Sequence, residues 1–233
     1  MIKLKHDIAW DPVGASTPAG YPDYVALRKH KAMNKIRFNN RLVLESASVE
    51  TMKEIYKTSE TVKELIKGVP KGAPRAGWVY ALIEQHRTAS TGSVSGVVSC
   101  RAGCGACCHT KVMVNAEEAD LLVMAAEKKN WAIDKIRLKI QKDFLSSDFY
   151  EADELVSRCV FLDDYQMCKI YEVRPMACRN LLVTTPAEYC KTDPDELKVV
   201  QVADLLPEVI AEAYDEVIGE KGSIAEMILD RIC

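Results

Sequence analysis

The chain has 233 residues, of which 48% are hydrophobic, so it is long enough to bury an ordinary core in one large or two modest domains. No run of eighteen apolar residues occurs, and the N-terminus has no apolar segment followed by a small-residue cleavage site. A membrane-spanning helix and a signal peptide are therefore not expected. We predict a cytoplasmic protein without membrane contact.

The net charge of −3 gives no general affinity for nucleic acid, but the charge is unevenly distributed along the chain. Residues 1–41 carry a net charge of about +5, and residues 193–233 about −8. The basic N-terminal arm is expected to be a solvated surface, with a phosphate- or acid-binding arm as the alternative. A protein partner is the favoured prediction, and nucleic acid bound through this arm is the less favoured one.

The first half of the chain is predicted to be mainly helical. A segment rich in Pro and Gly, 8–22, precedes a charged helix over 23–38. An amphipathic helix is expected over 48–68, with Ser48 as its N-cap and Gly68 as its stop. The next segments are a breaker at 69–77, a short helix at 78–87 and a flexible link at 88–96.

The second half is predicted to add further helices around one small hairpin. Asn115 and Glu118 form a capping pair before the apolar run at 116–126. Helical periodicity continues at 131–145, and a hairpin is expected at 159–171. Helices at 206–218 and 224–232 end the chain, the last preceded by a capping pair of Ser223 and Glu226.

These elements predict a mostly α fold with a small β-hairpin and irregular cysteine-rich loops organised around a metal centre. Three regions are expected. They are a basic N-terminal arm and helix at 1–40, a helical region and linker at 41–96, and a cysteine-cluster domain with C-terminal helices at 97–233.

Eight of the nine cysteines fall into two groups, and Cys233 stands apart at the C-terminus. The first group is Cys100, Cys104, Cys107 and Cys108, and the second is Cys159, Cys168, Cys178 and Cys190. The four positions of the first group would share one face of a helix, but Gly103 and Gly105 favour a tight loop instead. Buried free thiols and disulfides remain alternatives to a metal site, which is favoured because neighbouring thiolates converge on a soft metal with little entropy loss.

The cysteine-containing segments CRAGCGACC, 100–108, and CVFLDDYQMCKIYEVRPMACR, 159–179, resemble the CxxCxxCC or YkgJ-type family, described as zinc- or iron-chelating domains. The resemblance covers about residues 97–190. In the second segment it rests on Cys159, Phe161, Leu162, Cys168, Ile170, Tyr171, Arg174, Pro175, Cys178 and Arg179. Two features depart from the family pattern: the first spacing is C-x3-C instead of C-x2-C, and Cys190 is not a constant position.

The resemblance implies a metal bound by the eight grouped cysteines. The same cysteine pattern occurs in flagellin lysine N-methylases, for which an iron–sulfur cluster is implicated. An iron–sulfur cluster, [4Fe–4S] by the loop's C-x3-C-x2-C spacing, is therefore slightly favoured over zinc.

Two classes of function stay open. In the favoured class, the metal mainly organises the fold for binding a protein partner. In the alternative, an iron–sulfur centre serves redox or methyl-group chemistry beside a pocket formed by Arg174 and Arg179, whose guanidinium groups can offset thiolate charge or bind an anion. No set of nucleophile, base and orienting group is recognisable outside the cysteines, so catalytic residues cannot be assigned.

Overall fold

The computed structural model describes residues 48–91, 98–101, 103–145, 148–187, 190 and 206–232. The segments predicted at 8–22 and 23–38, and Cys233, lie outside these residues. No helix in the described part of the chain is long and apolar enough to cross a membrane.

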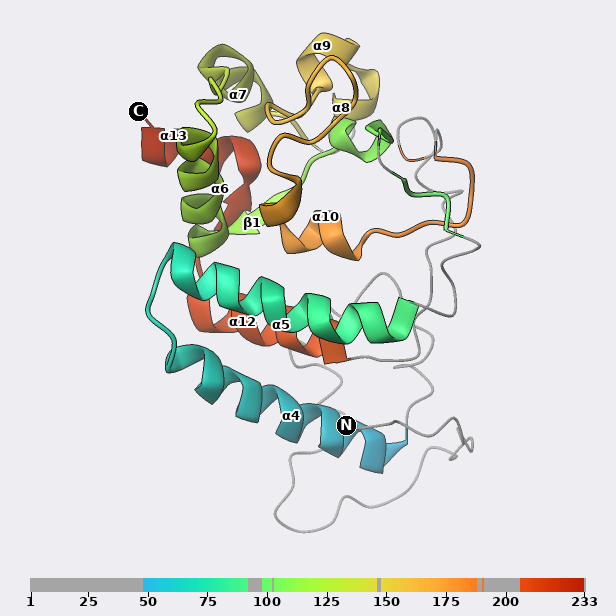
Figure 1. Cartoon of the computed structure of the whole chain (residues 1–233), viewed down its shortest axis with the longest axis vertical. Helices are drawn as coiled ribbons and strands as arrows, with labels where there is room; N and C mark the ends of the chain where they lie inside the picture. Colours follow the sequence, from blue (N-terminus) through green and yellow to red (C-terminus); the bar gives the residue numbers. More distant parts are fainter. Residues whose placement is uncertain are drawn as a thin grey trace.

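One hydrophobic core lies between the two long N-terminal helices and a helix from near the C-terminus (Figure 1). Helix α4 spans Val49–Lys67, α5 spans Ala73–Thr91 and α12 spans Leu206–Ile218. As predicted, α4 begins after Ser48, whose Oγ accepts a hydrogen bond from the Thr51 amide at 3.2 Å, and it ends at Gly68. The predicted helix at 206–218 is also confirmed, with Pro207 in its first turn.

The breaker predicted at 69–77 is too long, because α5 already begins at Ala73. Gly72, at a φ of +85°, makes the turn, and its carbonyl accepts hydrogen bonds from the amides of Arg75 and Ala76. Pro74 is tolerated in the first helical turn, where its missing N–H is not needed. Tertiary packing of Ala76, which is fully buried, outweighs the helix-weakening effect of Gly77.

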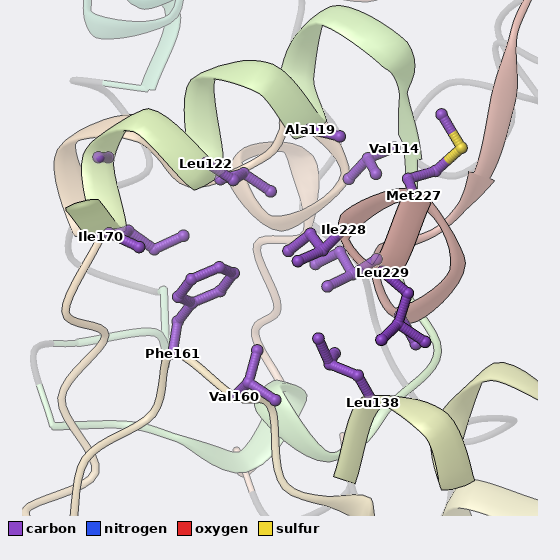
Figure 2. Close-up of a cluster of buried hydrophobic side chains, with 14 residues drawn as sticks. Val114, Ala119, Leu122, Leu138, Val160, Phe161, Ile170, Met227, Ile228 and Leu229 are labelled. Atoms are coloured by element: carbon purple, nitrogen blue, oxygen red, sulfur yellow. The ribbon is translucent and has the colours of Figure 1, made fainter. Parts of the chain in front are cut away.

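A second core joins the middle of the chain to its C-terminal end (Figure 2). Helix α6 spans Ala116–Lys128, α7 spans Lys135–Lys142 and α13 spans Ile224–Ile232. Helix α13 packs against both α6 and α7. The helix predicted at 131–145 is thus shorter, because the Asp134 carboxylate accepts from the Arg137 amide at 3.0 Å and caps α7 there.

The paired strands are not those of a local hairpin. Strand β1, Met113–Asn115, runs antiparallel to β2, Lys221–Ser223, and Val114 faces Gly222. In the segment predicted to form the hairpin, the chain does reverse, but it forms only one isolated antiparallel bridge, between Leu162 and Cys168. The remaining elements are single turns: η2 Ala106–His109, α8 Asp148–Glu151, α9 Glu154–Ser157, η3 Tyr171–Val173 and α10 Met176–Asn180.

Helix α6 separates the two cores and contributes to both. Leu122 belongs to the core with α13, and its neighbour Leu121 belongs to the core with α4, α5 and α12. The predicted capping pair is a complete capping box, in which Asn115 Oδ1 accepts from the Glu118 amide and Glu118 Oε2 accepts from the Asn115 amide, both at 3.0 Å. The start of α6 is therefore fixed by local hydrogen bonds and its two faces by long-range packing.

In the described part of the chain, α12 from the third predicted region packs on α4 and α5 from the second, so these two regions share a core. The domain boundaries themselves stay a prediction.

We expect Asn115→Ala to lower the free energy of unfolding by about 2–3 kcal/mol, because it removes a buried cap and the hydrogen bond from Asn115 Nδ2 to Asp215 Oδ1. Asp134→Ala removes the exposed cap of α7 and should cost about 1 kcal/mol or less. Urea unfolding of both variants measures the difference. Equal losses would contradict the structural importance given to the start of α6.

Candidate metal centre

The first cysteine loop is shaped by its two glycines. Gly103 adopts a φ of +77°, a conformation that favours glycine, and the Cys104 amide closes a turn onto the Arg101 carbonyl at 3.0 Å. A Cβ on Gly105 would collide with Gln166 Oε1 and lie 3.2 Å from Leu162 Cδ2. Gly105 thus lets the first cysteine loop approach the second closely, and the 3₁₀ turn η2 that follows carries Cys107 and Cys108.

The second cysteine segment reverses direction around the Asp163 side chain. Asp163 Oδ1 accepts hydrogen bonds from the amides of Tyr165 and Met167, at 2.9 and 2.8 Å. The Lys169 amide donates to the Phe161 carbonyl at 2.8 Å across the turn. This arrangement brings the chain back beside itself between Cys159 and Cys168.

Backbone hydrogen bonds hold the first loop at both ends. At its start, the Ser99 amide donates to the Val183 carbonyl at 2.8 Å, and the Val183 amide donates to Cys100 Sγ at 3.4 Å. At its end, the Cys159 amide donates to the Cys108 carbonyl at 2.7 Å. The first loop therefore lies between the second cysteine segment and the chain that follows α10.

Helix α10, which carries Cys178, is held in place by groups from the helical cores. The Met176 amide at its start donates to Glu118 Oε1 at 2.9 Å. The same oxygen accepts from the Tyr80 hydroxyl at 2.7 Å. Glu118 is a positioning residue that the sequence alone shows only as a helix cap, because both of these partners are distant in sequence.

All eight grouped cysteines are free thiols, so the disulfide alternative has no support in the described structure. Their electrostatic neighbours show that they gather in one region. Cys107 is among the strongest charge neighbours of Cys100, Cys108, Cys159, Cys168, Cys178 and Cys190. Four segments that are up to 90 residues apart in sequence thus meet around Cys107.

The thiols are gathered but not arranged as ligands. Among the described residues, no group of three or more His, Cys, Asp or Glu side chains has a metal-binding arrangement. Binding a metal here requires the side chains to converge further. The donor chemistry nevertheless fits zinc or an iron–sulfur cluster, both of which take four thiolates.

Hydrogen bonds to sulfur favour the thiolate form at several positions. The pKa of Cys107 is lowered to about 7, mainly because the Cys108 thiol donates a hydrogen bond to it, while the pKa of Cys108 is raised by the same contact and by burial. Burial raises the pKa of Cys159 to about 12 against a lowering contribution from the Phe161 amide. Burial likewise raises the pKa of Cys168, and a hydrogen bond from the Ile170 amide partly opposes this rise. Amide–sulfur bonds of this kind also stabilise metal-bound thiolates.

The two arginines predicted to bind a cofactor have different surroundings. The Arg174 guanidinium stacks on the Tyr171 ring, with its central carbon 4.3 Å from the ring centre. The pKa of Cys107 is lowered mainly by the hydrogen bond from Cys108, burial opposes this, and the positive charge of Arg174 lowers it further. The charge of Arg174 also lowers the pKa of Cys100, Cys168 and Cys178, against larger effects of burial. The Arg174 Nε is buried and has no hydrogen-bond partner within the described part of the chain. Arg174 therefore lies near enough to the thiols to favour their charged form, and its Nε is a donor without a partner among the described residues.

Arg179 is committed to the protein itself. Its Nε donates to the Arg174 carbonyl at 2.9 Å, one terminal nitrogen contacts Glu84 Oε2 at 3.1 Å and the other donates to the Glu172 carbonyl. Its guanidinium also lies 4.8 Å from the centre of the Tyr80 ring. These contacts tie α10 to α5, and a cofactor-binding role for Arg179 stays a prediction.

His109, directly after the first cysteine group, is buried, and both of its ring nitrogens lie near side chains of α9. Its Nδ1 lies 3.2 Å from Ser157 Oγ, and its Nε2 lies 3.8 Å from Glu154 Oε1. The donor set gathered here is therefore made of sulfur.

In the reduced, metal-free protein, we expect iodoacetamide to modify Cys107 first at about pH 8, because its thiolate forms near neutral pH while the buried thiols stay protonated. The rate should rise as the pH passes through about 7. Mass spectrometry of the alkylated peptides measures the site and its pH profile.

Cys107→Ser should abolish this fast reaction. Cys190→Ser removes a buried thiol whose pKa is raised to about 11, and it should leave the fast reaction unchanged. A fast reaction that survives Cys107→Ser would contradict the thiolate assignment.

Comparison with known proteins adds one finding. Residues 99–196 match the CxxCxxCC family, whose description reads "Putative zinc- or iron-chelating domain". No curated protein and no solved structure gives a significant match, so the likeness to flagellin lysine N-methylases stays a prediction. The match supports metal binding by the cysteines and includes Cys190. The segment 99–196, with all eight grouped cysteines, therefore matches the CxxCxxCC family of zinc- or iron-chelating domains, as its sequence pattern predicts.

Proposed function

We propose that the clustered cysteines bind an iron–sulfur cluster, and that this centre mainly organises the fold for binding a protein partner. The observation that carries the proposal is the meeting of eight free thiols, from segments far apart in sequence, around Cys107. Thiolates are the ligands that iron–sulfur clusters prefer.

An organising role is supported by the lack of regular structure around the thiols. Between residues 98 and 112 and between 158 and 187, the described chain forms short helical turns and isolated bridge positions but no strand. Cys159 and Cys168 pack against the core that contains α6 and α13. A metal bound by these cysteines would connect segments that have few backbone hydrogen bonds between them, and its binding free energy would add to folding stability.

Iron–sulfur chemistry is supported over zinc by the surroundings of the sulfurs. Amides donate to Cys159 and Cys168, and Arg174 places a positive charge beside four of the thiols. Hydrogen bonds to sulfur and local charge are the means by which proteins set the reduction potential of such clusters. When bound, the cluster would supply electron-transfer capacity at this site.

A second candidate is an iron–sulfur enzyme for redox or methyl-group chemistry. One observation favours it: the buried Nε of Arg174 has no partner among the described residues and could bind an anionic substrate near the sulfurs. The other predicted pocket residue, Arg179, is already occupied by Glu84 and two carbonyl groups. The organising role is therefore the stronger candidate.

Anaerobic purification followed by elemental analysis tests the cofactor. We expect about four irons per cluster, a visible absorption that dithionite bleaches, and a lower Tm after removal of the iron. Cys178→Ser should lose both the absorption and the gain in Tm. Colourless protein with bound zinc would contradict the iron assignment, and a metal-loaded protein with an unchanged Tm would contradict the organising role.

The charge of Arg174 provides a separate test of cluster binding. Arg174→Gln should lower the reduction potential, on the order of 50 mV, because the reduced cluster carries one more negative charge. Arg174→Lys keeps the charge and should restore most of the potential. Lys67→Gln removes an exposed charge at the end of α4 and serves as the control. A potential that is equal in all three variants would exclude Arg174 from the surroundings of the cluster.

A further inference from the structure

Helix α12 carries a row of three carboxylates, at Glu208, Glu212 and Glu216. Because they are four positions apart, their side chains share one side of the helix. One carboxylate oxygen of each is buried. The helix contains no lysine or arginine of its own. Buried carboxylates are costly unless positive charges lie close to them, so this acidic row depends on positive charges from other segments.

Helix α4 provides one of these positive charges. It packs against α12 (Figure 1), and Lys63 Nζ lies 2.5 Å from Glu216 Oε2. The same nitrogen lies 2.7 Å from Glu60 Oε1, so Lys63 serves one carboxylate on each helix. The acidic row therefore lies along the boundary between α4 and α12.

Apolar side chains lie on the same sides of the two helices. Met52 is eleven positions before Lys63, which places both on one side of α4. Val209 is three positions before Glu212 and seven before Glu216, on the acidic side of α12. Met52 and Val209 are buried, yet neither belongs to the two hydrophobic cores of the described chain. This surface, which combines the acidic row with apolar side chains, is called the α4–α12 face below.

The chain before α4 has the complementary sequence pattern. Residues 1–41 carry a net charge of about +5, and a helix is predicted over 23–38. On that predicted helix, Arg28, Lys31 and Lys35 share one side, at positions i, i+3 and i+7. Val25 and Ile36 share the side next to it. The predicted helix thus has a basic stripe, with nearly the same spacing as the acidic row of α12, beside an apolar stripe.

We propose that residues 23–38 dock on the α4–α12 face of their own chain, with the basic stripe along the acidic row and the apolar stripe against Met52 and Val209. Charge complementarity and the pairing of charged and apolar stripes support this occupant. The connection, residues 39–47, spans up to about 30 Å when extended. Packed helices lie about 10 Å apart, so the segment can reach α12 from the start of α4.

Docking of this kind gives the basic arm a role that needs no nucleic acid. Its ammonium and guanidinium groups neutralise carboxylates of this chain instead of phosphates. The arm then belongs to the helical layer of α4 and α12. The proposal goes beyond the proposed metal-binding function and does not rest on it.

Carbodiimide cross-linking of the full chain tests the contact directly. The reagent joins a lysine amine to a carboxylate through an amide bond only where the two groups touch. We expect mass spectrometry to find links from Lys31 or Lys35 to the acidic row, within one chain when isotope-labelled and unlabelled protein are mixed. The link between Lys63 and Glu216 is the internal control. Formation of the control link without any link from Lys31 or Lys35 to α12 would overturn the proposal, and so would links found only between chains.

A charge swap measures how strongly the segment is held. Lys31→Glu/Lys35→Glu should place like charges side by side and release the segment, so that chymotrypsin cleaves after Phe38 about tenfold faster than in the wild type. Adding Glu208→Lys/Glu212→Lys restores opposite charges and should return cleavage to near the wild-type rate. The arm sequence is identical in these two variants, so a difference in rate between them comes from α12.

Lys3→Glu/Lys5→Glu makes the same change of charge outside the predicted helix and should leave the cleavage rate unchanged. Cleavage that stays fast in the charge-swap variant, or that is equally fast in this control, would overturn the proposal. Circular dichroism checks that the helix content is kept, and if the α12 variants fail to fold, the cross-linking result decides. Neither measurement depends on bound metal, so a negative result here would leave the proposed function standing.

Discussion

The buried carboxylate of Glu118 accepts hydrogen bonds from three parts of the fold at once. Its donors are the Asn115 amide at the end of β1, the Tyr80 hydroxyl of α5 and the Met176 amide of α10. Burial raises the pKa of Glu118, and each of these donors opposes that rise. Removing one of these donors would leave a buried carboxylate oxygen without a hydrogen bond, which costs folding free energy. The three elements are therefore constrained to one relative arrangement. The position of Cys178 depends on this arrangement.

The cysteine region has the opposite physical character from the helical cores. Helices α4, α5, α6, α12 and α13 bury apolar faces against one another and need no cofactor to do so. The cysteine loops instead bring many thiols together, and burial keeps thiols such as Cys159 protonated. A metal ion changes this balance, because it replaces the protons and offsets the charge of the thiolates. The helical cores thus form the scaffold that holds the cysteine loops near one another, and metal binding would draw their sulfurs together.

Positive charge and close backbone approach are the two local requirements of that site. Arg174 supplies the charge from a position stacked on Tyr171, and Gly105 allows the first loop to lie against Leu162 and Gln166. Neither residue would bind a metal directly. Their contribution is to lower the electrostatic and steric cost of packing many sulfurs together.

The sequence by itself determined the features that depend on local chemistry: the capping of α4 at Ser48, the capping box of α6, and the two cysteine groups with their family pattern. Only the tertiary structure decided which strands pair, because β1 and β2 are three residues long and more than 100 residues apart. It also decided that α5 begins at Ala73 and that the Arg179 guanidinium donates a hydrogen bond to the Glu84 carboxylate. The physical reason is the same in each case: caps and ligand spacings depend on residues a few positions apart, whereas packing and buried hydrogen bonds depend on partners that only folding brings together.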